Sequence, residues 1–496
     1  MRILFIDIDT LRADHMGCYG YQRDTTPNLD KICADGIRFD NYYCADAPCL
    51  PSRASLISGM FGIRHGAVGH GGTSSDRRLI GKDRMFFDQF IDRDNFVNIF
   101  RKANMKTASI STFAERHSAW WYNAGFNETY NVGKGGMESG EEVLPVALDW
   151  VDRNAADDNW FLHVHLWDPH TPYRAPESFG NPFADEPLEK CVPWITQEVF
   201  DGHLKCAGPH TINDISMYDD KEDPQYPRHP GHAKNLTELK KLIDGYDTGI
   251  LYADYLIGQI IDKLKAMKLY DDLCVIISSD HGENMGELGI YSEHATADHG
   301  TCRIPLIIKW NGADKGRSEN GLYCNVDLAP TLAELMNVKP GRYWDGVSFA
   351  GNIKNKKSGG RESVVISQMA HVCQRSARFG DWLYMRTYHD GYHLFDDEML
   401  FNIAEDPHEQ NDVKDKFPQI CEKGAKIILD WHDEMMKKSV VTTMSSCTVD
   451  PLWTVLNEGG PEHTKLSDEE FDAYIKRLRE TGRSDGADKL EKKYGR

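Results

Sequence analysis

The 496-residue sequence has no long apolar run and no secretion signal. None of its apolar stretches approaches the roughly 18 residues that a membrane-spanning helix requires. Met1 and Arg2 lead directly into ILFIDID, which is too short and too acidic for a signal peptide. The sequence therefore predicts a cytoplasmic protein without a membrane span.

Positive charge is also scarce, because 57 Lys and Arg residues face 77 Asp and Glu residues and leave a formal net charge of −20. This charge argues against nucleic acid or an anionic membrane as a partner. A small anionic substrate remains compatible, since it needs only local positive charge. The twelve cysteines include no CxxC pair, which in a large cytoplasmic chain indicates reduced, mostly buried thiols.

Apolar runs alternate with helical patterns over the first 340 residues. Strands are predicted at Ile3–Asp9, Lys106–Ser111, Trp160–Trp167, Leu273–Asp280 and Ile304–Trp310, and helices at Thr26–Gly36, Ser52–Met60, Tyr246–Met267 and Pro330–Met336. This alternation predicts an α/β fold, in which helices cover both faces of a large, mostly parallel sheet.

The pattern changes at Asn352–Arg361, a stretch rich in Lys and Gly that is typical of a linker. We therefore expect a catalytic α/β domain at 1–355 and a smaller α+β domain with a tail at 356–496. Short strands at Val364–Ser367, Trp382–Tyr388 and Tyr392–Phe395 and a helix at Phe417–Met436 are predicted in the second domain.

Acidic residues follow two of the predicted strands. Asp9 ends the first strand, and the pair Asp280-His281 ends the strand near residue 275. Because ligands bind at the carboxyl ends of strands in open α/β sheets, both could point into one crevice and hold a divalent cation. Each signal alone is weak, since an Asp after a strand commonly caps a helix or a turn.

The sequence CLPSR, Cys49 to Arg53, stands before a predicted helix. The helix would direct its amide groups toward the preceding loop and favour an anion there. Arg53, about one turn further along, could reach back toward Cys49. From composition alone, a buried loop cysteine beside an exposed arginine is the preferred interpretation.

CLPSR, followed by Leu56 and Gly59, resembles the signature of the sulfatase family, in the alkaline phosphatase-like superfamily. Further stretches resemble the family in the same order: DIDTLRADHMGCYG, DPHTPY, SDHGENMGELG, RIPLIIKW, NVDLAPTLAEL and LFNIAEDPHEQND. These matches extend from Ile3 to Asp412.

The resemblance implies that a formylglycine-generating maturation enzyme oxidises Cys49. In the family, one hydroxyl of the hydrated aldehyde attacks the sulfur of a sulfate ester, and the alcohol leaves with a proton from a general acid. The second hydroxyl then loses its proton, sulfate is expelled and the aldehyde returns.

The resemblance also implies roles for individual residues. Asp9, Asp280 and His281 match metal ligands, with position 49 beside the cation, and Arg53 would hold the formylglycine hydroxyl. Ca²⁺ is the expected metal. Thr10 stands where the family often has a second acid, and imidazole is a softer ligand than calcium prefers, so Mn²⁺ or Mg²⁺ stays open.

Several histidines are candidates for contact with sulfate or for proton transfer. His170 of DPHTPY matches a family histidine, and His117 lies where the family has a Lys-x-His segment. The usual lysine after the second metal loop falls on Glu293 when counted forward from Gly286, and on His294 when counted back from Arg303. A carboxylate would repel sulfate, so His294 is preferred.

The same loop offers His299 as a second candidate for this contact. Trp121, in the loop sequence HSAWWYN, is a candidate to stack on a sugar ring. His163 and His165 face one side of a predicted strand and are expected to serve packing. The irregular stretch Asp450–His463 could close over the pocket from the C-terminal side.

The resulting functional prediction is a sulfatase acting on a small sulfated substrate, such as a mono- or disaccharide. A phosphonate monoester or phosphodiester hydrolase of the same superfamily is the alternative, toward which DIDTLRAD and Asp280-His281 lean somewhat. A third interpretation is a non-catalytic binding protein in which Cys49 stays a thiol.

Overall fold

The computed structural model describes residues 1–75, 94–355, 359–443 and 450–495. The larger sheet has eight strands in the order β11-β2-β10-β7-β1-β6-β4-β5. Their bounds are β1 (Arg2–Ile8), β2 (Ile37–Tyr43), β4 (Lys106–Ile110), β5 (Glu128–Tyr130), β6 (Trp160–Leu166), β7 (Leu273–Ser278), β10 (Leu306–Lys309) and β11 (Arg317–Cys324). Only β10 runs antiparallel to its neighbours in this sheet, which confirms the predicted, mostly parallel sheet.

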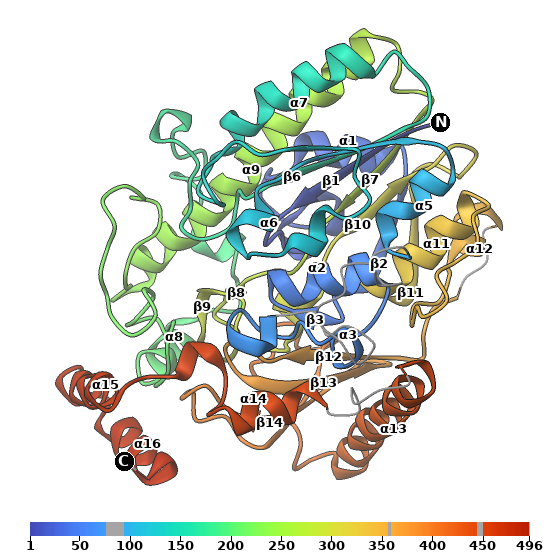
Figure 1. Ribbon diagram of the computed structural model, residues 1–496. Coiled ribbons are helices and arrows are strands. Elements are labelled where there is room, and N and C mark those ends of the chain that lie inside the picture. The colour runs from blue at the N-terminus through green and yellow to red at the C-terminus, as the bar shows by residue number, and fades with distance from the viewer. Residues whose placement is uncertain (76–93, 356–358, 444–449, 496) are drawn as a thin grey trace.

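Helices cover both faces of this sheet (Figure 1). One face carries α1 (Pro27–Ala34), α7 (Gly140–Asn154) and α9 (Leu236–Ala266), and the other carries α2 (Cys49–Ser58), α5 (Phe96–Lys102) and α11 (Leu328–Leu335). Side chains alternate along a strand, so Leu4 and Ile6 of β1 pack toward α9 while Ile3 and Phe5 pack toward α5. The same alternation directs Asp7 toward the face that α2 covers.

The smaller sheet has five strands in the order β15-β14-β13-β12-β3. Four come from the C-terminal part: β12 (Ser363–Gln368), β13 (Cys373–Phe379), β14 (Trp382–His389) and β15 (Glu398–Asn402). The fifth is β3 (Asp46–Ala47), which pairs in parallel with β12. The segment that leads into α2 is thus held by a sheet built mainly from residues beyond 356. The domain division at 355/356 remains a prediction.

The predicted strand Tyr392–Phe395 is wrong. Tyr392 has φ 71° and Leu394 has φ 61°, and a backbone in the left-handed region cannot continue a strand. This segment forms a turn between β14 and β15, and the sequence analysis predicted neither β13 nor β15. The helix predicted at Tyr246–Met267 begins ten residues earlier than expected, at Leu236.

The remaining described elements used below are short or C-terminal. They are α3 (Gly62–His65), α6 (Phe113–Arg116), η4 (Trp120–Asn123), α8 (Gln197–His203), β8 (Asn284–Met285), β9 (Tyr291–Glu293), α10 (His299–Cys302), α12 (Ala350–Asn355), α13 (Pro418–Thr443), α14 (Pro451–Asn457), α15 (Asp468–Glu480) and α16 (Ser484–Tyr494). In the part of the chain that the structure describes, we find no helix with the length and apolar character needed to cross a membrane.

We expect the buried ion pair between Arg375 of β13 and Asp450 beside α14 to stabilise the C-terminal part. The two nitrogens of Arg375 donate to the Asp450 carboxylate at 2.8 and 2.7 Å, and both side chains are buried. Arg375→Met should lower the free energy of unfolding by about 3 kcal/mol, because Asp450 would keep a buried charge without its arginine. Urea denaturation followed by circular dichroism measures this loss.

The matched control is Arg386→Met on the neighbouring strand. Arg386 pairs with Glu398 at 3.1 Å, and both side chains are more than two-fifths exposed. Solvent screens such a pair, so the control should cost less than about 1 kcal/mol. Equal losses in the two variants would contradict the argument from burial.

Candidate active site

The two predicted acidic strand ends lie side by side. β1 and β7 are parallel neighbours with Asp7 opposite Ser278, which brings Asp9 next to Asp280 beyond the ends of both strands. One ligand atom each of Asp9, Asp280 and His281 lies within 4.8 Å of the others, and all three side chains are buried. The structure therefore brings together residues about 270 positions apart in sequence.

Cys49 lies at the first position of α2, three residues before the predicted start of that helix. Its side chain is buried, with Sγ 3.5 Å from Nε2 of His70 and 3.8 Å from Nε2 of His117. Cys49, His281 and His294 form a second group of ligand atoms within 4.8 Å of one another. Because His281 belongs to both groups, Cys49 adjoins the carboxylates.

Arg53 lies on the next turn of α2, and its guanidinium faces carboxylates. Nη1 donates to Asp9 Oδ2 at 2.9 Å and also to Asp280, while Nη2 donates to Asp7 Oδ1 at 3.1 Å. The resemblance implied a contact with position 49 instead. Among the described hydrogen bonds, those of the guanidinium go to the three carboxylates, so a contact with a modified position 49 stays a prediction.

The charges in this group do not balance within the protein. Asp7, Asp9 and Asp280 contribute three negative charges when ionised, and Arg53 contributes one positive charge. Burial, together with the charges of Asp9 and Asp7, raises the pKa of Asp280 to about 8 despite Arg53. A divalent cation would match the two remaining negative charges and keep Asp280 ionised.

His281 is prepared as a neutral metal ligand. Its Nδ1 lies 2.8 Å from the carbonyl oxygen of Gly282 and donates to it, which leaves a lone pair on Nε2. Nε2 is buried, has no hydrogen-bond partner among the described residues, and lies 3.4 Å from Asp280 Oδ2. Burial and nearby His294 lower the pKa of His281 to about 3. These residues therefore fit the implied divalent metal.

His163 and His165 hold the carboxylates of β1 rather than only filling the core. Nε2 of His163 lies 3.3 Å from Asp7 Oδ2, and Nε2 of His165 lies 3.3 Å from Asp9 Oδ2. The opposite ring nitrogens contact the hydroxyls of Ser109 and Ser111, each at 2.9 Å. Both histidines thus orient the acidic side chains, a role that the sequence analysis did not predict.

His170 and His294 both lie close to the residues grouped around Asp9 and Cys49. Nε2 of His170 is 3.9 Å from Asp9 Oδ1, and its ring centroid is 5.4 Å from that of His294. The His294 ring lies 4.2 Å from that of His281, and its Nε2 lies 2.9 Å from Glu293 Oε1. Burial lowers the pKa of His294, but the nearby carboxylates of Glu293, Glu283 and Asp9 together raise it above the ordinary value.

The other three predicted site residues differ in placement. His117 adjoins Cys49, and burial lowers its pKa to about 3. Trp121 is buried in the same apolar cluster as Cys49, whereas its neighbour Trp120 is 47% exposed. His299 belongs to another network, in which its Nδ1 lies 2.8 Å from the hydroxyl of Tyr43.

Three further histidines near Cys49 were not predicted from the sequence as site residues: His70, His371 and His463. The His463 ring stacks on His371 with a centroid distance of 4.0 Å, and its centroid lies 5.8 Å from that of His70. His463 ends the stretch Asp450–His463, whose closure over the pocket stays a prediction. His70 and His371 carried no comparable signal.

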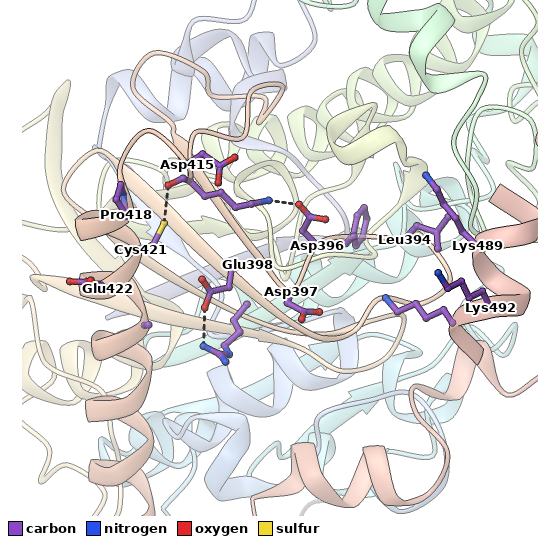
Figure 2. Close-up of a pocket in the computed structure, with 15 residues that line it drawn as sticks. Leu394, Asp396, Asp397, Glu398, Asp415, Pro418, Cys421, Glu422, Lys489 and Lys492 are labelled. Atoms are coloured by element: carbon purple, nitrogen blue, oxygen red, sulfur yellow. Dashed lines mark hydrogen bonds and ion pairs between the residues drawn. The ribbon is translucent and has the colours of Figure 1, made fainter. Parts of the chain in front are cut away.

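A separate surface hollow of about 1300 Å³ lies between β14, β15, α13 and α16. Figure 2 shows its side chains, which include the acids Asp396, Asp397 and Glu398 and, at one side of the hollow, Lys489 and Lys492 of α16. Its described lining includes none of the residues grouped around Cys49. Its mixture of exposed acids and lysines provides no arrangement comparable to the buried cluster.

The large, mostly parallel sheet with helices on both faces, together with the smaller sheet from the C-terminal part, is an alkaline phosphatase-like fold. The Sulfatase family model matches residues 2–338. The chain therefore belongs to the sulfatase family.

Curated relatives agree with this assignment. A sulfatase of Formosa agariphila is 23% identical, with 68% of this chain and 69% of the relative covered. A choline-sulfatase of Rhizobium meliloti is 25% identical, with 77% and 76% covered. An N-acetylglucosamine-6-O-sulfatase of Bacteroides thetaiotaomicron is 22% identical, with 83% and 82% covered.

Solved structures share the fold. The phosphonate monoester hydrolase of Agrobacterium radiobacter superposes with a TM-score of 0.66 at 19% identity, covering 88% of this chain and 96% of that one. A protein solved with its substrate D-glucosamine-2-N,6-O-disulfate gives a TM-score of 0.68 at 18% identity, covering 88% and 98%.

We expect Asp280→Asn to lower the affinity for a divalent cation by more than about 100-fold. This loss exceeds the loss of affinity that substitutions of residues around the ligands commonly cause. Asn keeps the shape of the side chain but removes a charged ligand. Isothermal titration of metal-free protein with Mn²⁺ or Ca²⁺ measures the affinity.

Asp254→Asn is the matched control. Asp254 is a buried carboxylate of α9 that accepts hydrogen bonds from the amides of Asn28 and Leu29 at the start of α1. This variant should bind the cation like the wild type. Unchanged affinity in Asp280→Asn would show that the cation binds elsewhere.

Proposed function

We propose that the protein hydrolyses sulfate esters through a formylglycine made from Cys49 and a divalent cation held by Asp9, Asp280 and His281. The observation that carries this proposal is the shared position of His281, which lies in reach of both the carboxylates and Cys49. A nucleophile and a cation site thus meet at one point in a chain of the sulfatase family.

An unmodified Cys49 is a poor nucleophile in this environment. Burial raises the pKa of its thiol well above the ordinary value, and the carboxylates of Asp9 and Asp280 raise it further. The thiol therefore stays protonated near neutral pH. The hydrated aldehyde would supply two hydroxyls instead, one to attack sulfur and one whose deprotonation expels sulfate.

The burial of Cys49 also bears on its maturation. Cys49 is 1% exposed, lies within the first turn of α2, and follows β3, which is fixed in the smaller sheet. A formylglycine-generating enzyme could not reach this side chain in the folded protein. We infer that the maturation enzyme acts on CLPSR before the chain folds.

The divalent cation would supply a positive charge for the sulfate oxygens and lower the cost of charge that develops there. Asp9, Asp280 and His281 would hold the cation. Arg53 would stay hydrogen-bonded to Asp9 and Asp280 beside it. Ca²⁺ is the metal that we expect; because imidazole is a softer ligand than Ca²⁺ prefers, Mn²⁺ or Mg²⁺ stays open.

His294 suits the role of general acid better than the other histidines beside Cys49. Burial lowers the pKa of His70 and His170 well below the ordinary value, and that of His117 to about 3, which leaves these rings neutral. Glu293 favours the protonated form of His294. His294 would therefore give a proton to the leaving alcohol.

The substrate we propose is a small sulfated saccharide. Relatives named for N-acetylglucosamine-6-O-sulfate and N-acetylgalactosamine-6-O-sulfate support this class, although their identities to this chain are low. Exposed Trp120 beside the cluster offers an aromatic face for a sugar ring. A cytoplasmic location and independence from nucleic acid and membranes remain parts of the proposal.

A phosphonate monoester or phosphodiester hydrolase is the second candidate, favoured by the likeness in fold to phosphonate monoester hydrolases. Parallel assays with 4-nitrophenyl sulfate, a panel of sulfated saccharides and an aryl phosphodiester separate the two. We expect the sulfate esters to be hydrolysed faster. Dominant phosphodiester turnover would reverse this ranking.

Cys49→Ala should abolish turnover of every substrate without unfolding the chain, because it removes the precursor of the nucleophile. Intact-mass measurement of the wild type should detect the aldehyde at position 49. Wild-type rates in Cys49→Ala, with circular dichroism unchanged, would contradict the proposed nucleophile.

We expect His294→Ala to lower activity more than Glu293→Ala. His294 would donate the proton itself, whereas Glu293 would act only indirectly, by favouring the protonated form of His294. With an alkyl or sugar sulfate, the loss in kcat should be about 10²- to 10⁴-fold. With 4-nitrophenyl sulfate, whose leaving group needs no proton, the loss should be much smaller. The opposite order of the two variants, or equal losses with both substrates, would show that His294 is not the acid.

A further inference from the structure

Besides His294, Glu293 has two further histidine partners, neither of which belongs to the group of Asp9, Asp280 and His281. Its carboxylate lies between His210 and His371, and one ligand atom of each residue lies within 4.8 Å of the others. We propose that Glu293, His210 and His371 form a second binding site for a divalent cation of the zinc class. This inference goes beyond the proposed function and does not depend on it.

The distances suit one small ion bound by all three residues. Nε2 of His210 lies 3.2 Å from Glu293 Oε2, and Nε2 of His371 lies 3.5 Å from Glu293 Oε1. Ligands about 2.1 Å from a tetrahedral Zn²⁺ are separated by roughly 3.4 Å from one another. Two histidines with one glutamate form a ligand set known from catalytic zinc sites, which keep the fourth position for water or substrate.

The ring of His210 is oriented as a ligand. Its Nδ1 lies 2.9 Å from the carbonyl oxygen of Ile215 and donates to it, so the neutral ring carries its lone pair on Nε2. Nε2 has no hydrogen-bond partner among the described residues, although the side chain is about nine-tenths buried. A lone pair beside a carboxylate oxygen requires a cation or a proton between them.

His371 gives the second, independent observation. Its side chain is 3% exposed, and in the described part of the chain neither ring nitrogen has a hydrogen-bond partner. Leaving two buried nitrogens without partners is costly, and coordination of a cation would satisfy one of them.

The backbone fixes these residues although they come from three distant segments. His210 follows α8, Glu293 ends β9, and His371 lies between β12 and β13. The amide of Tyr291 donates to the carbonyl of His210 at 2.9 Å, and the side chain of Gln368 donates to the carbonyl of His294 at 2.8 Å. The ligand positions are thus set by the folded chain before any ion binds.

Glu293 also links this site to the candidate active site. Its Oε1 lies 2.9 Å from Nε2 of His294, which belongs to the group with Cys49 and His281. An ion at Glu293 would therefore lie close to the bound ester. Its open position could accept an oxygen of the substrate outside the sulfate group, such as a hydroxyl or a second sulfate.

Metal counting tests this proposal without any measurement of turnover. The Cys49→Ala full-length chain serves as the background, because a free thiol beside His281 and His294 could itself bind zinc. Metal-free protein is titrated with Zn²⁺, desalted and analysed by mass spectrometry for bound metal. We expect two Zn²⁺ per chain, and one in the further variants His371→Gln, Glu293→Gln and Asp280→Asn.

His463→Gln is the matched control, since His463 stacks on His371 but is not one of the three ligands, and it should retain two Zn²⁺. Co²⁺ gives a second readout, because its visible absorption at a tetrahedral site should disappear in His371→Gln and persist in Asp280→Asn. Circular dichroism verifies that each variant is folded, and His371→Gln remains a test if Glu293→Gln does not fold.

The second site would be overturned if the Cys49→Ala background bound one Zn²⁺ per chain, Asp280→Asn lost that ion and His371→Gln kept it. This outcome would leave the proposed function intact. Two Zn²⁺ in all variants would overturn it as well. The opposite outcome is a wild type without sulfatase activity together with a His371→Gln variant that still loses one of two Zn²⁺. It would contradict only the proposed function.

Discussion

The candidate site depends on the concentration of buried negative charge at the ends of β1 and β7. Asp7, Asp9 and Asp280 are buried around the single guanidinium of Arg53. Carboxylates so close together are stable only when positive charge or hydrogen-bond donors surround them. α2 supplies the arginine from the same helical segment that begins at Cys49, so the position of Cys49 and the neutralisation of the carboxylates have one structural origin.

Neighbouring side chains on two sides hold the carboxylates in position. His163 and His165 of β6 contact the carboxylates of Asp7 and Asp9. On the opposite side of each ring, Ser109 of β4 contacts His163, and Ser111, just beyond β4, contacts His165. Histidines from segments far apart in sequence close the other side around Cys49. Most of these rings are neutral because of burial, whereas Glu293 makes His294 the exception. A site rich in imidazole can therefore assign metal binding and proton transfer to different rings.

Much of this arrangement was predictable from the sequence. Apolar runs ending in Asp9 and in Asp280-His281 predicted two strands with ligands at the same sheet edge, and the family resemblance of CLPSR identified Cys49. The C-terminal part was less predictable. The left-handed backbone at Tyr392 and Leu394 removed a predicted strand, and β13, which carries Arg375, was missed because its residues are buried on both faces and show no alternation. Neutral histidines such as His70 and His371 carry no local signal, since their partners come from other segments.

The sequence by itself determined the fold class, the family, and the strand-end position of the metal-ligand candidates, because these depend on local hydrophobic periodicity and on residues close together in the chain. Only the tertiary structure decided the direction in which Arg53 points, the burial of Trp121, the separate location of His299 and the convergence of His210, Glu293 and His371. The physical reason is that charge pairing and burial act between segments brought together by packing, and a linear pattern does not record those distances.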